Sequence, residues 1–171
     1  MDQQGILIKT LNEQGEVIGS KPRSEVNKQT DILHCADVLI VQSGKIILAK
    51  VPTDGKALYG GMWAVPTATI VRVGESSEEA AHRSLAKELG VTGAVLTSLG
   101  DHFFSYSDGV KRLKSTFITT FEGALNPNPA DVAELRFFSR DELASAIQST
   151  PEVFAPTFLG IWEVYHTAFA G

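Results

Sequence analysis

Two glutamates and an arginine between Gly74 and Val91 are the residues of this sequence best suited to chemistry. Glu75 precedes Arg83, and Glu88 follows it within the same short segment. Carboxylate oxygens are the ligands that Mg²⁺ prefers, and a guanidinium forms paired hydrogen bonds with carboxylates or phosphates. The same residues also suit a structural role, in which Arg83 and Glu75 form an ion pair and Glu88 is a solvated charge. Both interpretations stay open at this point.

A helix is predicted to position these residues. Ser76 and Glu79 form a capping box, in which each side chain satisfies a free amide of the other residue, and Gly90 supplies a left-handed stop. The apolar residues that recur at four-residue spacing and would face the core are Ala81, Leu85 and Leu89. We therefore expect a helix over residues 76–90.

The segment resembles the Nudix box, the signature of a superfamily of hydrolases. The matching residues are Glu75, Arg83, Leu85, Glu88, Gly90 and Val91. The resemblance implies the Nudix fold, an α+β arrangement in which a mixed β-sheet is flanked by helices as an α/β/α sandwich. It also implies that Glu75, Arg83 and Glu88 are catalytic and that Glu75 and Glu88 hold Mg²⁺.

The chain departs from the box at metal-binding positions. Nudix hydrolases carry glutamates where this chain has Ser84 and Lys87, and a glycine where it has Thr69. Glutamates at positions 84, 87 and 88 would converge on the metal, because these positions lie one helical turn apart. Lys87 instead repels a cation, by about 4 kcal/mol per unit charge pair at ~4 Å and a dielectric of about 20. We expect one weakly bound Mg²⁺. A substitute carboxylate is left open, and the candidates are Asp101, Glu122 and Asp131.

A wider resemblance covers nearly the whole chain and points to isopentenyl diphosphate isomerases and their hydrolase-like relatives. It rests on residues 12–19, 22–26, 33–34 and 61–63. Those isomerases use a cysteine and a glutamate for proton transfer, and histidines and glutamates to hold a metal. The residues at these positions here are Ala68, Ile70, Arg112, Lys114 and Asn27, with His34 alone retained. Isomerase activity is therefore disfavoured, since hydrocarbon side chains transfer no proton.

Cationic residues in the same stretches predict that the protein holds an anion. Arg23 and Lys56 stand where the isomerases bind diphosphate, and both side chains form charge-assisted bonds with phosphate. Further candidates for the same pocket are Lys50, Trp63, Arg112 and Lys114. The alternative for each lysine and for Arg112 is a position on a solvated face.

These residues predict a small-molecule diphosphate as partner. In the enzyme hypothesis, the protein is a weak Mg²⁺-dependent hydrolase of a nucleoside diphosphate-type substrate, in which the ion polarises a phosphoryl oxygen and activates water. In the alternative, the protein is a diphosphate-binding module without turnover. A third class, a structural or interaction protein, would bind no diphosphate.

The remaining pattern predicts strands before and after the central helix. The expected strands cover residues 6–8, 16–18, 38–41, 46–49, 95–99, 103–106 and 110–121, and two further helices cover residues 139–147 and 157–168. We expect a single domain over residues 1–171, with a β-hairpin at about residues 5–19 packed on it.

Composition limits the classes of partner. The chain has 171 residues and a net charge of −5, so its overall field repels nucleic acid and anionic membranes. Cys35 is the single cysteine, which excludes an intrachain disulfide. The first residues lack the features of a signal peptide, and no apolar run approaches the ~20 residues of a membrane span. We expect a cytoplasmic protein and leave the oligomeric state open, with a homodimer as one alternative.

Overall fold

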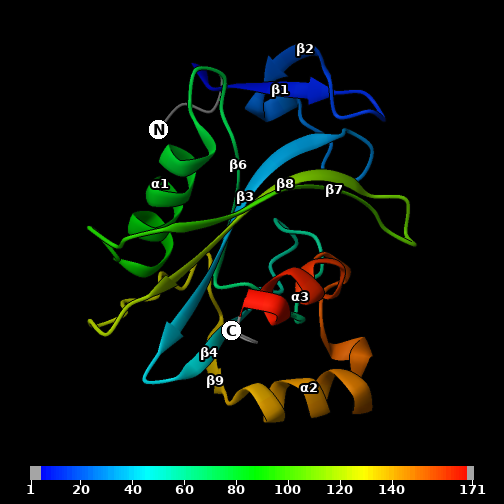
Figure 1. The fold of residues 1–171 in the computed structure, drawn as a ribbon. Coiled ribbons are helices and arrows are strands. Elements are labelled where there is room, and N and C mark those ends of the chain that lie inside the picture. The colour runs from blue at the N-terminus through cyan, green and yellow to red at the C-terminus, as the bar shows by residue number, and fades with distance from the viewer. Residues whose placement is uncertain (1–4, 169–171) are drawn as a thin grey trace.

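A mixed β-sheet runs through the centre of the computed structural model, which describes residues 5–168 (Figure 1). Residues 1–4, on which the expectation about a signal peptide rests, lie outside that range. The strands are β1 (Leu7–Leu11), β2 (Val17–Pro22), β3 (Leu33–Gln42), β4 (Lys45–Lys50), β5 (Trp63–Ala64), β6 (Thr67–Ile70), β7 (Thr97–Ser105), β8 (Lys111–Thr120) and β9 (Glu134–Phe138). The helices are α1 (Ser77–Leu89), α2 (Arg140–Ser149) and α3 (Pro156–Ala168).

Strand β3 divides its pairing between two neighbours, and this division shapes the sheet. Along one edge it runs parallel to β8, from Leu33 opposite Arg112 to Val41 opposite Thr120. Along the other edge, residues 35–38 pair with β6 and residues 40–42 pair with β4. Strand β4 leaves β3 after this short stretch and pairs with β5 at residues 49–50, while β9 pairs with β4 over residues 46–50. The two partners of β3 diverge, which leaves room for a site between them.

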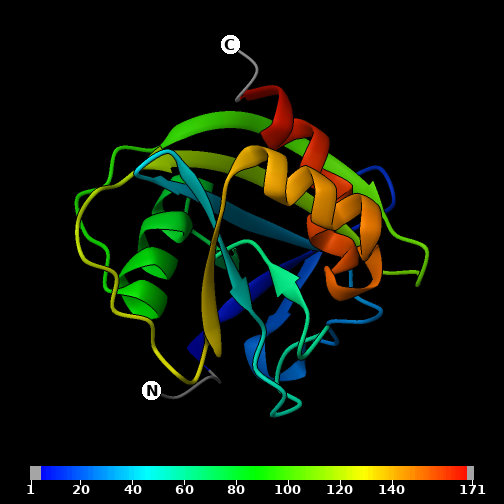
Figure 2. The same cartoon turned by 90° about the horizontal axis from the view of Figure 1, so that it is seen from below.

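Helices cover both faces of the sheet, as Figure 2 shows from below. Helix α1 packs on one face through a core that includes Ala36, Val38 and Leu85. Helices α2 and α3 pack on the other face, around Leu39 and Phe158. Neighbouring residues of β3 serve opposite cores because side chains alternate along a strand. The predicted α+β fold, a mixed sheet flanked by helices, is confirmed.

The predicted capping box of α1 is present, and a second one begins α2. The Ser76 hydroxyl accepts from the Glu79 amide at 3.1 Å, and the Glu79 carboxylate accepts from the Ser76 amide at 2.7 Å. Ser139 begins α2 in the same way. Gly90 ends α1 with φ +65°, a left-handed conformation that residues with a Cβ rarely adopt. These local signals fix where α1 begins and ends, and so where its polar side chains lie.

The N-terminal hairpin and the strands after α1 differ in extent from the sequence-based expectation. Strand β2 continues to Pro22, and Ile8 of β1 packs with Leu33 beneath the hairpin. Strand β7 is one strand where two were predicted, with an irregular register between Ser98 and Asp101. Gly100, at φ +92°, absorbs that irregularity. Strands β5, β6 and β9 were not predicted.

Within residues 5–168, no helix combines the length and the apolar character that crossing a membrane requires.

Candidate functional site

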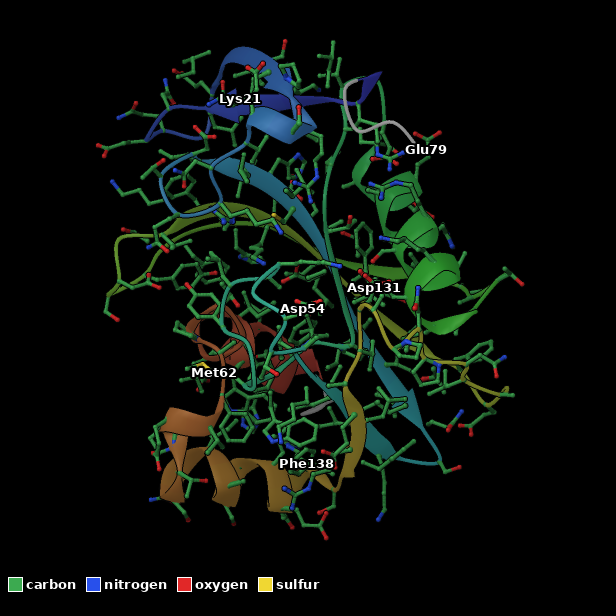
Figure 3. All side chains as sticks on the ribbon, turned by 180° about the vertical axis from the view of Figure 1, so that it is seen from behind. Lys21, Asp54, Met62, Glu79, Asp131 and Phe138 are labelled. Atoms are coloured by element: carbon green, nitrogen blue, oxygen red, sulfur yellow. The ribbon has the colours of Figure 1, made fainter. Side chains whose placement is uncertain are left out.

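A cavity of about 430 Å³ lies where β4 and β6 diverge. Its walls come from β3, β4, β6, the segment after β4, the carboxyl end of α1 and the loop before β9. Figure 3 shows two of its residues, Asp54 and Asp131, on segments far apart in the sequence. Among the described residues, the lining includes the cations Arg23, Lys28, Lys50, Lys56, Lys87, Arg112 and Lys114 and the carboxylates Asp54, Glu88 and Asp131. The charge of the cavity is thus opposite to the net charge of the chain, which favours an anionic ligand.

The two cations of β8 lie on the floor of this cavity. Arg112 is 6% exposed, and its Nη1 donates to the carbonyls of Asp31 at 3.1 Å and Lys111 at 2.8 Å. Its Nη2 donates to the carbonyl of Lys28. These acceptors are neutral, so the hydrogen bonds hold the guanidinium in place without cancelling its charge. Lys114, in contrast, pairs with the buried Asp37 at 3.0 Å.

Arg23 and Lys28 bring further positive charge from the segment after β2. The Arg23 guanidinium and the Lys28 ammonium both lack a carboxylate within 4.0 Å among residues 5–168. Burial lowers the pKa of both groups, and the neighbouring Arg23 and Arg112 lower the pKa of Lys28 further. A phosphate bound among these three residues would relieve their mutual repulsion.

Lys50 and Lys56 reach the cavity, but Trp63 does not line it. The Lys56 ammonium is 81% exposed and lies 3.9 Å from Asp54. Lys50 extends over the ring of Trp63, with Nζ 5.6 Å from the ring centroid. Trp63 is 8% exposed and packs in the core under α2 and α3. Its contact with the site is through Lys50.

Glu75 and Arg83 form a double hydrogen bond away from the cavity lining. Arg83 Nε donates to Glu75 Oε1 at 2.7 Å and Arg83 Nη2 to Oε2 at 3.0 Å. The Glu75 Oε2 also accepts from the Arg72 amide at 3.0 Å. Burial raises the pKa of Glu75, but these hydrogen bonds outweigh it and hold the pKa below its usual value. The pair ties the loop before α1 to the helix, and both carboxylate oxygens of Glu75 are engaged.

Arg83 also contacts β6. Its Nη2 donates to the Ile70 carbonyl at 3.1 Å, and its Nη1 donates to the Thr69 hydroxyl at 3.3 Å. Thr69, one of the departures from the box, thus becomes a partner of the box arginine. These contacts orient α1 against the strand that forms one wall of the cavity.

Glu88 lines the cavity beside a carboxylate that comes from outside α1. The loop before β9 caps the helix, because the Asn128 amide donates to the Glu88 carbonyl at 2.8 Å and the Asn126 amide to the Leu89 carbonyl at 2.8 Å. This capping places Asp131 next to Glu88. Burial and the charge of Asp131 raise the pKa of Glu88 to about 8. Asp101 and Glu122, the other candidates for a substitute carboxylate, bond to Ser115 and Ser43 and do not line the cavity.

The oxygen atoms around Glu88 are suited to one hard cation. Asp131 Oδ2 is buried without a hydrogen-bond partner among the described residues. The buried hydroxyl of Ser84, one helical turn before Glu88, faces the Glu88 carboxylate. Carboxylate and hydroxyl oxygens are ligands that Mg²⁺ accepts. Lys87 opposes such an ion, with Nζ 3.7 Å from Asp131 Oδ1. Within residues 5–168, no group of three or more histidine, cysteine or acidic side chains forms a metal-binding cluster.

Comparison with known proteins decides the family. A family model described as the NUDIX domain matches residues 33–158, which includes the cavity walls from β3 to the start of α3. The chain belongs to the NUDIX family. The box residues Glu75, Arg83 and Glu88 all lie inside the matched range.

Curated relatives and solved structures agree with this assignment. An uncharacterized Nudix hydrolase of Pseudomonas aeruginosa is 31% identical over 138 residues, which are 81% of this chain and 80% of that protein. An isopentenyl-diphosphate Delta-isomerase of Paenarthrobacter aurescens is 29% identical over 162 residues, 91% of this chain and 87% of the isomerase. The NUDIX domain of Shewanella oneidensis NrtR, solved with ADP ribose, shares the fold with a TM-score of 0.63 and 16% identity, over 85% of this chain and 95% of that domain.

In this NUDIX chain, the residues that replace isomerase catalytic groups face the cavity. Ala68 and Ile70 present only hydrocarbon there, and Cys35 lies opposite Ile70 across the β3–β6 pairing. Burial raises the pKa of the Cys35 thiol, which keeps it protonated. His34 does not line the cavity, and its Nε2 lies 2.7 Å from the hydroxyl of Ser115. It follows that these positions offer no group poised for proton transfer across a carbon chain.

Sequence reasoning missed Lys28 as a cavity residue. It lies in a polar stretch between the hairpin and β3, without a motif or a periodic pattern that would mark it. Its place depends on the fold, because Arg112 of β8 holds the Lys28 carbonyl. A pattern search along one chain has no access to such a contact.

Proposed function

We propose that this protein binds a diphosphate compound in the cavity between β4 and β6 and hydrolyses it weakly with one divalent cation. The observation that carries the proposal is the group formed by Arg23, Lys28 and Arg112. These cations meet at one cavity and have no carboxylate partner within 4.0 Å among the described residues. Buried or half-buried cations without a counter-charge are costly unless a ligand supplies the charge.

The phosphates would be held by side chains from several elements. Arg23 and Arg112 suit paired hydrogen bonds with phosphate oxygens, because a guanidinium presents its donors in a fixed plane. Lys56 and Lys50 would add charge from the segment after β4 and from β4 itself. Lys114 would contribute less, since it is already paired with Asp37.

The cation would be held by Glu88 and Asp131, with the Ser84 hydroxyl beside them. When bound, Mg²⁺ would polarise a phosphoryl oxygen and lower the pKa of a water molecule. Glu75, the predicted partner of Glu88, would take no part in this arrangement, because both of its oxygens accept hydrogen bonds from Arg83 and Arg72. Glu75 and Arg83 would instead position α1, and with it Glu88.

We propose two classes of compound as substrates. ADP ribose is bound by the NrtR NUDIX domain, which shares this fold. A nucleoside diphosphate-type compound is therefore the first candidate for this chain. An alkyl diphosphate is the second, because an isomerase of isopentenyl diphosphate is among the relatives and part of the cavity lining is aliphatic, including Val65, Ala68 and Ile70.

A binding module without turnover is the alternative function. It is favoured by Ser84 and Lys87, which stand where NUDIX hydrolases carry glutamates, and by the repulsion that Lys87 adds. Both alternatives predict ligand binding, and they differ only in the release of phosphate.

The test is a thermal-shift series followed by an assay of turnover. Purified protein is heated with inorganic pyrophosphate, ADP ribose or isopentenyl diphosphate, each with and without Mg²⁺, and the stabilising compounds are assayed for phosphate or monophosphate release. Mg²⁺-dependent release that Glu88→Gln abolishes and Glu78→Gln leaves intact supports the hydrolase. Stabilisation without release supports the binding module. If none of the compounds stabilises the protein, the proposal of a diphosphate site is wrong.

A further inference from the structure

Lys28 joins the floor of the cavity to the segment that covers it. Its Nζ lines the cavity and donates to the Lys56 carbonyl at 2.8 Å. Its own carbonyl accepts from Arg112, which fixes its backbone on the floor. One residue thus connects the anion-binding group to a chain segment on the opposite wall.

The covering segment, residues 52–62, is held at its base and at two side-chain contacts. At the base, the Val51 amide donates to the Met62 carbonyl at 2.9 Å, and the Gly61 amide donates to the Val51 carbonyl at 2.8 Å. The first side-chain contact is the bond from Lys28 to Lys56. The second is the Tyr59 hydroxyl, which donates to Asp108 in the β7–β8 turn at 2.5 Å. Tyr59 has φ +65°, a conformation that costs free energy in a residue with a side chain. Tyr59 and Met62 also pack against the core under α2 and α3. Residues 53–57 are exposed, so this part of the segment has few ties.

The bond from Lys28 to Lys56 is one that a phosphate can replace. A backbone carbonyl is a neutral acceptor, whereas a phosphate oxygen is charged and forms a stronger hydrogen bond with an ammonium. Lys28 also lies beside Arg23 and Arg112, whose repulsion a phosphate would cancel. An anion on the floor of the cavity thus attracts the same ammonium that holds the cover.

We propose that Lys28 is an anion-binding residue that exchanges the Lys56 carbonyl for a phosphate oxygen and thereby lets residues 53–58 close on the ligand. The inference rests on the proposed diphosphate site. Once the segment is released, the Lys56 ammonium can turn toward the ligand, because its side chain is 81% exposed and its carboxylate partner, Asp54, is 3.9 Å away. An exposed pair at that distance is weak and yields readily to a doubly charged phosphate.

The experiment combines affinity and amide hydrogen exchange, with inorganic pyrophosphate as the probe. Affinity is measured by calorimetry without added metal, and exchange is followed in residues 53–58 with and without pyrophosphate. The variants are Lys28→Met and Tyr59→Phe. Lys28→Met removes the ammonium. Tyr59→Phe removes the hydrogen bond to Asp108, which loosens the segment, but keeps the Lys28 ammonium. Lys45→Met, at the exposed start of β4 and outside this cavity, is the charge-matched control.

We expect pyrophosphate to slow exchange in residues 53–58 of the wild-type protein. Lys28→Met is expected to exchange faster when free, to bind pyrophosphate about tenfold more weakly or worse, and to lose the protection. Tyr59→Phe is expected to exchange faster when free but to bind pyrophosphate within about threefold of wild type. The comparison of the two variants therefore separates the effect of a looser segment from the effect of losing the ammonium.

Two results would overturn the inference while leaving the diphosphate site intact. One is wild-type binding of pyrophosphate without slower exchange in residues 53–58. The other is a Lys28→Met protein that exchanges faster but binds as tightly as wild type, which would make Lys28 a structural tether only. If wild-type protein fails to bind pyrophosphate and the other diphosphates, the proposed function falls first and this inference falls with it.

Discussion

Asp131 lies beside Glu88 although the two carboxylates come from different elements, a loop and a helix. Burial and the charge of Asp131 together raise the pKa of Glu88 to about 8. The loop is fixed there by its own amides, which cap the carboxyl end of α1. Near neutral pH, Glu88 therefore holds a proton that a divalent cation must displace.

Cation binding should consequently depend on pH. Since Glu88 is protonated below about pH 8, affinity for Mn²⁺ or Mg²⁺ is expected to rise with pH from 6.5 to 8.5 and to level off above that. Displacement of one proton changes the cation affinity by up to about tenfold per pH unit below the pKa of Glu88. Calorimetric titration with Mn²⁺ at several pH values measures this slope. Asp131→Asn should weaken binding and flatten the profile, whereas an affinity independent of pH in wild type would contradict the assignment.

The same pKa makes a prediction about stability. Glu88 binds a proton more tightly in the folded than in the unfolded protein, whose glutamates titrate near 4.5. Folding stability from this group is therefore fully present below pH 4.5 and is lost as the pH rises through 8. Glu88→Gln avoids the loss and should be more stable than wild type at pH 8.5, by on the order of 2 kcal/mol or about 4–8 °C. The difference should vanish near pH 5.

Thermal melts of Glu88→Gln and wild type across pH 5 to 9 check this expectation. Glu78→Gln is the matched control, since Glu78 is an exposed glutamate of the same helix, and it should show no such trend. If both variants track wild type at every pH, Glu88 carries no raised pKa.

The ion pair between Glu75 and Arg83 should matter for stability and little for ligand binding. Both side chains are largely buried, and Glu75→Gln leaves the Arg83 charge partly uncompensated, at a cost of about 2 kcal/mol. A double-mutant cycle with Arg83→Met should give a coupling of about 1–2 kcal/mol by urea unfolding. Pyrophosphate affinity should change less than twofold, because neither residue lines the cavity. Equal unfolding curves for Glu75→Gln and wild type would show that the pair is not a structural tie.

Much of the fold could be predicted because its signals are local. The capping boxes at Ser76 and Ser139 and the glycine stop at Gly90 depend on residues only a few positions apart. Strand β9 was missed because it carries exposed residues, among them Phe137, and gains its place by pairing with β4. Strand β5 has two residues and no pattern of its own. Such strands exist through their partners and not through their composition.

The residue types of the candidate site could be predicted from the sequence, but the contacts between its residues could be predicted less well. The cations Arg23, Lys50, Lys56, Arg112 and Lys114 were proposed as one set, and the structure brings them to one cavity. Asp131 was one of three candidates for a carboxylate beside Glu88, but the sequence could not choose among them, because Asp131 reaches Glu88 through the capping of α1 by a loop distant in sequence. Trp63 belongs to a matching motif, yet it packs in the core. A motif thus identifies a position without stating which way its side chain faces.

Lys87 offers the most direct control over the strength of the cation site. Its Nζ lies 3.7 Å from Asp131 Oδ1, so it repels a cation and also occupies one of the two carboxylates proposed to bind it. Lys87→Gln removes both effects and should tighten Mn²⁺ binding by about threefold to tenfold, a moderate gain because the side chain is 65% exposed and its charge is screened.

Lys87→Glu should tighten binding further, since it adds a carboxylate at a position where NUDIX hydrolases carry one. Calorimetry with Mn²⁺ at pH 8.5, where Glu88 is largely ionised, separates these effects from proton release. Lys45→Gln is the control for the change in net charge, and the gain from Lys87→Gln should shrink at high salt. A carboxylate introduced one residue from Glu88 must affect a cation bound between Glu88 and Asp131. If Lys87→Glu binds Mn²⁺ no better than wild type, the cation site therefore lies elsewhere.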